Sequence, residues 1–272
     1  MTLRILTAVP LAFIVVWLIG WSPQWLFLLA LVATVELALY EYFRISRQAG
    51  LRAMPVFGYA AGAALCLAQF HELRQPGPLG FAVPTIAVLG ALALALQAVE
   101  NLKEYLAAAA STILGVLYIA LSLSWLVPIR FSDPASGREL MLLLFLVIWA
   151  GDIFAFFVGR AVGRTLLFPR VSPKKTVEGA VGGLAASLLA AWGFAHWFWR
   201  TADLKMVMLL AALVAIAGQV GDFVESALKR GAGLKDSGSL LPGHGGLLDR
   251  IDSLIFGAPA MWLGIVIWNV LK

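Results

Sequence analysis

Charged side chains are scarce in this chain of 272 residues, of which 13% are Asp, Glu, Lys or Arg. Soluble domains carry about 25% charged residues and roughly 45–50% apolar ones, whereas 61% of this chain is apolar. The composition therefore excludes a water-soluble globular protein, and the chain is expected to reside in a lipid bilayer.

Residues that commonly build redox or zinc sites are also few. The single cysteine, Cys66, lies in an apolar run, so no intrachain disulfide can form and a reactive thiol is not expected. Of the three histidines, His71 and His196 fall at the ends of apolar runs and are interpreted as interfacial. His244 stands between glycines without a second ligand at zinc spacing, which favours a hydrogen bond to a phosphate or to Asp249.

Long apolar runs dominate instead, and a membrane-spanning helix needs about 20 residues. By this measure the sequence predicts an all-α polytopic membrane protein with about nine transmembrane helices. They are expected near residues 4–21, 23–40, 55–70, 79–99, 105–128, 139–159, 179–199, 206–226 and 252–271. These spans leave no room for a separate soluble domain, so one integrated membrane domain is expected.

The two parts of the chain differ in polar content. Residues 1–130 are mostly leucine- and alanine-rich spans and are interpreted as a scaffold for lipid access or oligomer contacts. Residues 131–272 carry the long polar loops and most charges within spans, so they are predicted to form the catalytic region.

Basic residues predict the orientation of the chain. With nine helices, one set of loops holds 14 Lys and Arg residues and the opposite set holds 6. The positive-inside rule then places the N-terminus and the two richest loops in the cytoplasm and the C-terminus outside. The net charge of +5 is interpreted as loop charge, and no nucleic-acid partner is expected.

A first polar segment ends the sixth predicted span, where Asp152 lies within the membrane near its cytoplasmic face. An ionisable group there costs roughly 2.5–3.5 kcal/mol on insertion scales and by default marks a functional site. The alternative is a helix-end carboxylate that only pairs with Arg160 or Arg164.

A second polar segment, residues 172–179, leads into the seventh predicted span. Proline and a hydroxyl residue at a helix start leave backbone N–H groups free, and Lys174 and Lys175 beside them form a candidate site for phosphate oxygens. The same lysines could instead only anchor the loop to anionic lipid headgroups.

The strongest polar pattern runs from residue 221 to residue 252. Asp222, Glu225, Ser226 and Lys229 have the spacing i, i+3, i+4, i+7. They therefore share one face at the cytoplasmic end of the eighth predicted helix, where lipid would demand apolar groups.

Asp249 and Asp252 stand at the start of the ninth predicted helix, where a helix N-terminus favours negative charge. Carboxylates from two helices can thus approach one point, and hard oxygen ligands of this kind suit Mg²⁺. Gly243, Gly245 and Gly246 let the intervening backbone turn tightly and approach a ligand closely. Together with the basic residues, these groups fit a polyphosphate that meets a lipid phosphate at the membrane surface.

The run from residue 226 to residue 252 resembles the signature of phosphatidate cytidylyltransferases, also called CDP-diacylglycerol synthases. The matching positions are Ser226, Leu228, Lys229, Arg230, Lys235, Asp236, Gly238, Leu241, Pro242, His244, Gly245, Gly246, Asp249, Arg250 and Asp252. Residues 151–160 and 172–179 also resemble blocks of this family, in the expected order. Ile153 and Phe156 depart from the pattern, which has Thr and Tyr there.

The resemblance implies that CTP and phosphatidate react to CDP-diacylglycerol and pyrophosphate with Mg²⁺, a second cation being left open. It assigns Asp222 and Asp249 to the metal and Lys229 to the phosphates, these three being the catalytic candidates. Further candidates for substrate binding are Ser172, Lys174, Lys175, Thr176, Ser226, Arg230, Lys235, His244, Gly245, Gly246 and Arg250. Supporting roles are expected for Asp152, Glu178, Glu225, Asp236 and Asp252.

The resemblance also implies a homodimer in a bacterial inner membrane, with the active site facing the cytoplasm. Two other functions stay open at this point. A CTP-dependent lipid-alcohol kinase would need similar groups and, in addition, a base for a hydroxyl of high pKa. A transporter of an anionic solute is favoured by carboxylates within spans, yet few polar positions continue toward the outer face.

Overall fold

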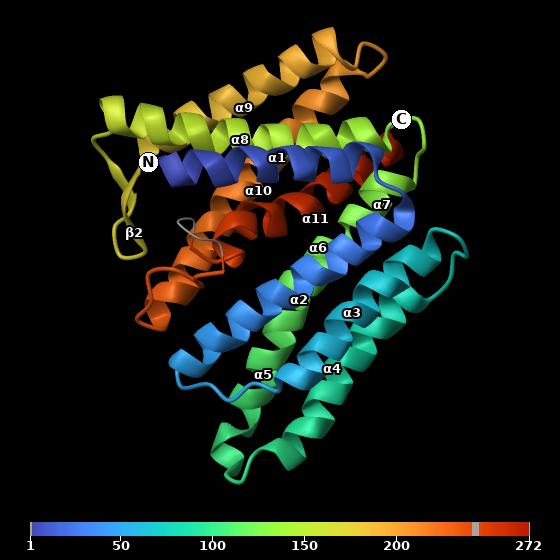
Figure 1. The fold of residues 1–272 in the computed structure, drawn as a ribbon, viewed down its shortest axis with the longest axis vertical. Helices are drawn as coiled ribbons and strands as arrows, with labels where there is room; N and C mark the ends of the chain where they lie inside the picture. The colour runs from blue at the N-terminus through green and yellow to red at the C-terminus, as the bar shows by residue number, and fades with distance from the viewer. Residues whose placement is uncertain (1, 241–244, 272) are drawn as a thin grey trace. The chain divides into compact units, whose positions relative to one another are not determined.

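The computed structural model describes residues 2–240 and 245–271, with side chains at residue 10 and from residue 12 onward. Apart from one small sheet the described elements are helices, which confirms the predicted all-α architecture (Figure 1). In chain order they are α1 (Thr2–Trp21), α2 (Gln24–Gln48), α3 (Pro55–Glu72), α4 (Leu79–Ala98), η1 (Leu102–Glu104), α5 (Tyr105–Gly115), η2 (Val116–Leu121), α6 (Ser122–Ser124), α7 (Leu126–Phe131), α8 (Gly137–Val162), β1 (Leu166–Phe168), β2 (Ser172–Thr176), α9 (Val177–Trp197), α10 (Leu204–Gly231) and α11 (Leu248–Leu271).

Seven helical segments of the described chain are long and apolar enough to cross a membrane: α2, α4, the segment Leu102–Phe131, α8, α9, α10 and α11. The predicted number of nine is therefore not confirmed. Helix α3 has 18 residues and ends in Gln69, His71 and Glu72, and it is not among the seven. In α1, the apolar stretch Ala12–Trp21 is shorter than the seven and is not counted among them.

The predicted fifth span is an interrupted helix. Its α5 part passes into the π-helical turn η2, and α6 and α7 follow with a break at Trp125. Pro128 explains the break, because its ring clashes with the carbonyl group four residues earlier and it has no N–H to donate. That earlier residue is Ser124, the last residue of α6. A span predicted from hydropathy alone misses such an interruption.

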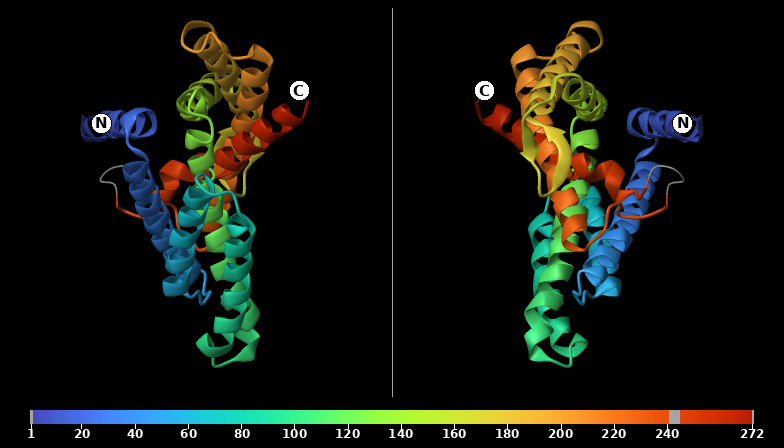
Figure 2. Two further views of the ribbon diagram at one scale, coloured as in Figure 1. Left: turned by 90° about the vertical axis from the view of Figure 1, so that its right-hand side faces the viewer. Right: turned by 90° about the vertical axis from the view of Figure 1, so that its left-hand side faces the viewer.

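The chain divides into two units by its contacts. The first comprises Met1–Ser132 and Leu228–Ile251, and the second comprises Asp133–Ala227 and Asp252–Lys272. In the first unit α2, α3, α4 and α5 pack in sequence, and they lie side by side in both views (Figures 1 and 2). Val35, Leu39, Leu65 and Ile119 form part of its core.

In the second unit, α8 and α9 pack through small residues. Gly151 and Ala155 on α8 face Gly183 and Ser187 on α9, where a Cβ on Gly183 would lie 2.7 Å from the Gly151 carbonyl oxygen. Ser187 is buried and donates a hydrogen bond to the carbonyl oxygen of Val147, 2.8 Å away. Small residues four positions apart let two helices in a membrane approach closely, and α8 and α9 run alongside each other in Figure 1.

A β-hairpin, which the sequence did not predict, joins α8 to α9. Strands β1 and β2 are antiparallel, with Leu166 opposite Thr176 and Phe168 opposite Ser172. The predicted helix start at Ser172 and Pro173 is therefore wrong, because both residues lie in strand β2, which runs to Thr176. Thr176 then caps α9, because its Oγ1 accepts a hydrogen bond from Gly179 N at 3.1 Å.

Helix α10 is longer than the predicted span 206–226. It continues to Gly231, so Lys229 and Arg230 lie on its last turn. Gly233, at φ +70°, follows the helix end, where left-handed backbone favours glycine. The chain then reaches the loop before α11.

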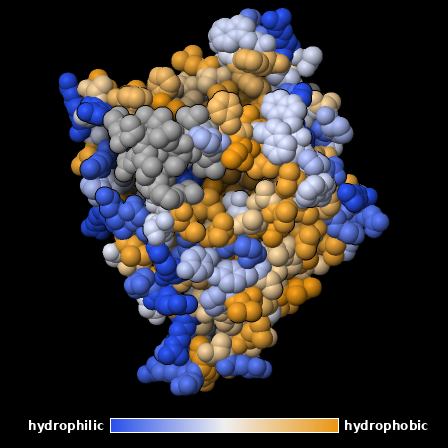
Figure 3. All heavy atoms as spheres, viewed as in Figure 1, coloured by the Kyte–Doolittle hydropathy of each residue, from blue (hydrophilic) through white to orange (hydrophobic). Residues whose placement is uncertain are grey.

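Large apolar side chains cover much of the molecular surface. Phe81, Val56 and Phe198 are among the most exposed of them, with 79% to 85% of their surface accessible. On the face drawn in Figure 3, hydrophobic side chains dominate and hydrophilic ones gather mainly along the margins. With the seven long apolar helices, this identifies an integral membrane protein.

Candidate functional site

A cavity of about 540 Å³ lies in the second unit and is named the polar cavity, because eight of its fifteen lining residues are polar or charged. Its walls come from α8, the hairpin, α9 and α10. The side chains that matter for chemistry are Asp152, Arg160, Ser172, Lys174, Lys175, Thr176, Gln219 and Asp222, with Phe156 and Phe223 as aromatic walls. Five of the predicted binding or catalytic residues and the supporting residue Asp152 therefore line one cavity.

Two contacts dock the hairpin onto α10 beside this cavity. The ammonium group of Lys175 forms an ion pair with Asp222 Oδ2 and lies 4.8 Å from the centroid of the Phe223 ring. Phe168 of β1 meets the same ring edge-on, at a centroid distance of 5.0 Å. The hairpin thereby brings a lysine of the second polar segment to a carboxylate of the third, although the two are 47 positions apart.

Glu178 orders the turn between α8 and β1. Its carboxylate accepts hydrogen bonds from the backbone N–H groups of Arg164 (3.1 Å) and Thr165 (3.2 Å). Gln219 of α10 donates to the carbonyl oxygen of Ala180 at 3.0 Å and links α10 to α9. Sequence reasoning missed Gln219, although a glutamine within an apolar helix is a signal of such a contact.

All four residues of the predicted polar face lie on one continuous helix, α10. Their burial differs, however. Asp222 and Ser226 are partly exposed, whereas Glu225 is fully buried and Lys229 is 9% exposed. Glu225 is thus a buried group of the helix, in keeping with a supporting role.

Asp249, on the first turn of α11 in the first unit, is surrounded by donors. Lys229 Nζ lies 2.6 Å from its Oδ1, and Gly246 N lies 2.8 Å from its Oδ2. Ser237 N approaches both oxygens, at 3.2 Å and 3.0 Å. A carboxylate offers about four lone-pair positions, so these contacts nearly fill its capacity. Asp249 therefore organises the loop that precedes α11.

The remaining predicted residues of this region are mostly exposed. Arg230 donates to the carbonyl oxygen of Leu234 at 2.9 Å, and Lys235, Asp236 and Arg250 lie at the surface. Gly245 has φ +81°, a left-handed conformation that glycine adopts without strain. His244 lies outside the described residues.

Asp252 belongs to the second unit, where α10 and α11 approach each other closely. A Cβ on Gly221 would lie 2.5 Å from the carbonyl oxygen of Asp252. The carboxylate of Asp252 accepts a hydrogen bond from Ser253 N at 2.7 Å. Glycine at position 221 thus permits the contact between the two helices next to Asp222.

The two predicted metal ligands belong to different units, Asp222 to the second and Asp249 to the first. Each has a lysine partner within its own unit, Lys175 and Lys229 respectively. Among the described residues, no group of three or more His, Cys, Asp or Glu side chains is placed to hold a metal ion. The metal assignment stays a prediction.

The first unit contributes two residues that the sequence analysis overlooked, Glu41 and Arg44 of α2. Both form hydrogen bonds of 2.6 to 3.0 Å with residues just before or at the start of α11. A carboxylate inside a long apolar helix is itself a signal of a site, but the sequence analysis interpreted this part of the chain as scaffold.

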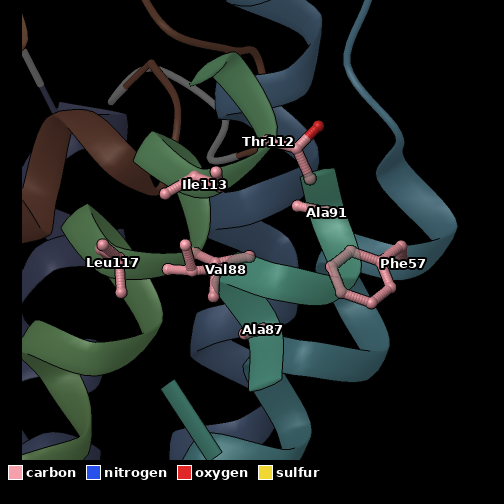
Figure 4. A pocket seen from close by; sticks show the side chains of 8 residues that line it. Phe57, Ala87, Val88, Ala91, Thr112, Ile113 and Leu117 are labelled. Carbon is pink, nitrogen blue, oxygen red and sulfur yellow. The ribbon is translucent and has the colours of Figure 1, made fainter. Parts of the chain in front are cut away.

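A second pocket, in the first unit, carries no comparable chemistry. It lies among α3, α4, α5 and η2, and Figure 4 shows Phe57, Ala87 and Val88 on its walls. Of the described residues that line it, only Thr112 is polar. The hydroxyl of Thr112 already donates to Ala108 O and accepts from Met54 N, both at 2.9 Å. This pocket is a packing gap between helices.

The polar cavity of the second unit therefore offers what an amphiphilic phosphate ligand requires. Arg160, Lys174 and Lys175 supply positive charge, and Asp152 and Asp222 supply hard oxygen donors. Phe156, one of the two departures from the family pattern, lies in the wall of this cavity. The departure thus replaces a hydroxyl with an apolar ring at the site.

Comparison with known proteins gives one consistent result. Residues 2–268 match the cytidylyltransferase family. A phosphatidate cytidylyltransferase of Staphylococcus haemolyticus is 31% identical over 265 residues, which cover 96% of this chain and 97% of that protein. Proteins of the same name from Brucella abortus and a Synechocystis species are 37% and 32% identical, over 96% and 98% of this chain and 91% and 97% of their own lengths.

Proposed function

Because the chain belongs to the cytidylyltransferase family, we propose that it transfers the cytidylyl group of CTP to phosphatidate, forming CDP-diacylglycerol and pyrophosphate. The names of its full-length relatives support this reaction. The structural observation that carries the proposal is the polar cavity of the second unit, in which lysines and carboxylates meet aromatic side chains on membrane helices.

The basic residues of the cavity bind the phosphates in this mechanism. Lys174 and Lys175 neutralise phosphate charge, and the ion pair with Asp222 holds the Lys175 ammonium group at the cavity wall. Bringing two anionic substrates together needs such neutralisation, since the reaction depends on positioning and electrostatics. A lipid phosphate monoester has a second pKa of about 6, so it is mostly a dianion at neutral pH and needs little help from a base.

The phosphatidate oxygen attacks the α-phosphorus of CTP, and the bond from that phosphorus to the oxygen of the β-phosphate breaks. Pyrophosphate leaves, and the lipid retains the α-phosphate and the nucleoside. Phe156 and Phe223 give the cavity an apolar wall, which suits the lipid part of one substrate better than bulk water would.

The donor set fits a divalent cation at Asp222. Its carboxylate is 28% exposed and lines the cavity together with that of Asp152, and a cation bound there would compete with Lys175 for Oδ2. Mg²⁺, when bound, neutralises charge on phosphate oxygens, and Asp222 and Asp249 are its proposed ligands. Asp249 has the same donor chemistry, but Lys229 occupies its Oδ1, so a cation at Asp249 would compete with Lys229. Released Lys229 would then be available to a phosphate.

The proposed location is a bacterial cytoplasmic membrane, with the polar cavity open to the cytoplasm. CTP is a soluble cytoplasmic nucleotide, whereas phosphatidate stays in the bilayer, so the site must serve both phases. The two loops richest in basic residues, before α9 and before α11, are separated by two membrane helices and therefore lie on one side, which supports this orientation. We further propose a homodimer, as the family resemblance implies.

Labelled CTP tests the proposed reaction on the purified protein with phosphatidate and Mg²⁺ in detergent. Label in the α-phosphate is expected to appear in the lipid product, because the α-phosphorus is the atom attacked. Label in the γ-phosphate is expected to leave as pyrophosphate.

Transfer of γ-label to a lipid alcohol would instead identify a CTP-dependent kinase and contradict the proposal. Movement of an anionic solute across sealed vesicles without CTP consumption would identify a transporter. ATP in place of CTP serves as the control nucleotide, and no lipid product is expected from it.

A further inference from the structure

A buried carboxylate on α2 binds the loop that leads into α11. Glu41 is 1% exposed. Its Oε2 accepts hydrogen bonds from Ser237 Oγ and Leu248 N, both at 2.8 Å, and its Oε1 accepts one from Leu247 N at 3.0 Å. All of these residues belong to the first unit.

Two of these donors stand at the start of α11. The first N–H groups of a helix have no partner within the helix, and negative charge near them is favourable. Leu248 is the first residue of α11 and Leu247 directly precedes it. Glu41 therefore anchors the N-terminus of α11 from another helix, and these charge-assisted bonds offset the cost of its burial.

Arg44, one turn later on α2, holds the same loop from a second side. Its Nη2 donates to the carbonyl oxygen of Ser237 at 2.6 Å. Ser237 is fully buried, with its hydroxyl group bonded to Glu41 and its carbonyl group bonded to Arg44. Helix α2 thus fixes this residue through two independent bonds.

Ser237 connects Glu41 to the predicted catalytic residues. The backbone N–H of Ser237 donates a hydrogen bond to the carboxylate of Asp249, which also accepts one from the ammonium group of Lys229. A shift of Ser237 would therefore shift one of the hydrogen-bond donors to Asp249. The start of α11 carries Asp249 as its second residue, so the bonds from Glu41 to Leu247 and Leu248 act on the same carboxylate.

Two glycines of the family signature make room for Glu41. A Cβ on Gly238 or on Gly246 would overlap the carboxylate oxygens of Glu41. From the sequence, Gly246 is expected to permit close approach to a ligand. In the structure the group that approaches it is a side chain of the same protein.

We propose that Glu41 is a positioning residue for cytidylyl transfer, acting through Ser237 and the start of α11 to hold Asp249 and Lys229. This inference rests on the proposed function, and it places a part of the reaction machinery in the helices that the sequence suggested were scaffold. Glu41 affects the reaction indirectly, because it holds Ser237 and the start of α11, on which the positions of Asp249 and Lys229 depend.

Glu41→Gln tests the proposal, because the variant keeps the size of the side chain but replaces one acceptor oxygen with an NH₂ donor. That donor would face N–H or O–H groups. The loop is then expected to lose its fixed position, and misplacement of reacting groups by about 1 Å can lower a rate on the order of 100-fold. We expect kcat of the folded variant to fall 10- to 100-fold.

Hydrogen exchange supplies a readout that does not depend on activity. In Glu41→Gln, backbone exchange is expected to increase in peptides that cover residues 237–240 and 245–249 and to stay unchanged in α8 and α9. Glu36→Gln is the matched control, because Glu36 lies on the same helix and, among the described residues, takes no part in this network. It should leave kcat and exchange at wild-type values.

Three results would overturn the inference: wild-type kcat in Glu41→Gln, an equal loss in Glu36→Gln, or a loss that vanishes when activity is counted per folded molecule. Wild-type protein that forms no CDP-diacylglycerol would refute the proposed function instead, so the two failures are distinct. If Glu41→Gln does not fold, Ser237→Ala removes one bond to Glu41 and leaves the backbone donor to Asp249. Its kcat is expected to fall several-fold with faster loop exchange, and wild-type values for both would refute the proposal.

Discussion

At the scale of single residues, the two carboxylates proposed for the metal have different surroundings. Asp222 is 28% exposed beside Lys175, whereas Asp249 is 6% exposed and accepts bonds from Lys229, Ser237 and Gly246. An exposed ion pair contributes little to stability. A buried carboxylate that satisfies several donors contributes more, because each donor would otherwise lose its partner.

This contrast predicts how the two Asp→Asn variants should differ. Both are expected to lose activity on the order of 100-fold, the usual effect of removing a group that stabilises transition-state charge. Asp249→Asn should also lose about 1–3 kcal/mol of stability, because the new amide group would face existing donors. Asp222→Asn should stay within about 1 kcal/mol of the wild type.

Activity in detergent and thermal unfolding of the same preparations measure these two effects. Asp203→Asn is a suitable control, since Asp203 is an exposed carboxylate that accepts a hydrogen bond from the nearby Lys205 N. Near-normal turnover in either Asp222→Asn or Asp249→Asn would contradict its catalytic assignment. Equal stability of the two variants would contradict the different roles assigned here.

At the scale of secondary structure elements, the contact between α8 and α9 places the cavity walls. Gly179 and Gly183 leave space that the facing backbone fills, and Gly151 leaves space for the hydroxyl group of Ser187. Asp152 follows Gly151 directly, and β2 leads into α9 two residues before Gly179. Separation of the two helices would therefore move Asp152 and the lysines of the hairpin at once.

Gly183→Ala is expected to disturb this packing. Its Cβ would lie 2.7 Å from the carbonyl oxygen of Gly151 and 2.9 Å from the Cβ of Ala155, both tighter than normal contact. Overpacking of this kind costs about 1–3 kcal/mol. The denaturation midpoint in an SDS titration should fall, and activity should fall with it.

Gly20→Ala is the matched control, because nothing lies within 4 Å of its added Cβ and Gly20 is also helical. Alanine favours helix by roughly 0.5–1 kcal/mol over glycine, so this variant should be as stable as the wild type or slightly more so. A midpoint for Gly183→Ala equal to that of Gly20→Ala would show that the α8 and α9 contact is looser than described.

At the scale of the whole molecule, the proposed orientation can be tested by cysteine labelling. Cys66 is fully buried and gives little background. Ser239 lies in the loop before α11, and Gln75 lies in the loop between α3 and α4, both exposed. Loop charge assigns the first to the cytoplasm and the second to the outside.

Ser239→Cys is accordingly expected to react with a membrane-impermeant maleimide in inverted vesicles and to stay unlabelled in intact spheroplasts. Gln75→Cys should show the opposite pattern. Labelling of Ser239→Cys in spheroplasts would contradict a cytoplasmic site. Labelling of both positions from the same side would mean that the number of spans between them is even, against the predicted parity.

Several properties of this protein follow from the sequence alone. Hydropathy and length predicted the seven membrane helices of the described chain, because transfer of apolar side chains into lipid is a local property of each segment, but they also predicted two spans that are not among these seven. The positions of Ser226, Lys229 and Asp249 within a family signature point to the reaction from the sequence alone. The interruption near Pro128 and the hairpin were not predicted, because hydropathy does not report backbone hydrogen bonds.

Only the tertiary structure decided which partner each polar group takes. The bonds of Glu41 to Ser237, Leu247 and Leu248 join residues 196 to 207 positions apart, and no periodicity along the chain encodes such a pair. The ion pair of Lys175 with Asp222 depends likewise on a hairpin that folds back onto α10. The sequence determined that the protein is a membrane enzyme of this family, because apolar segments and the family motif are both local features of the sequence. The tertiary structure decided the environment of its carboxylates, because hydrogen bonds form between polar groups that packing brings close to each other.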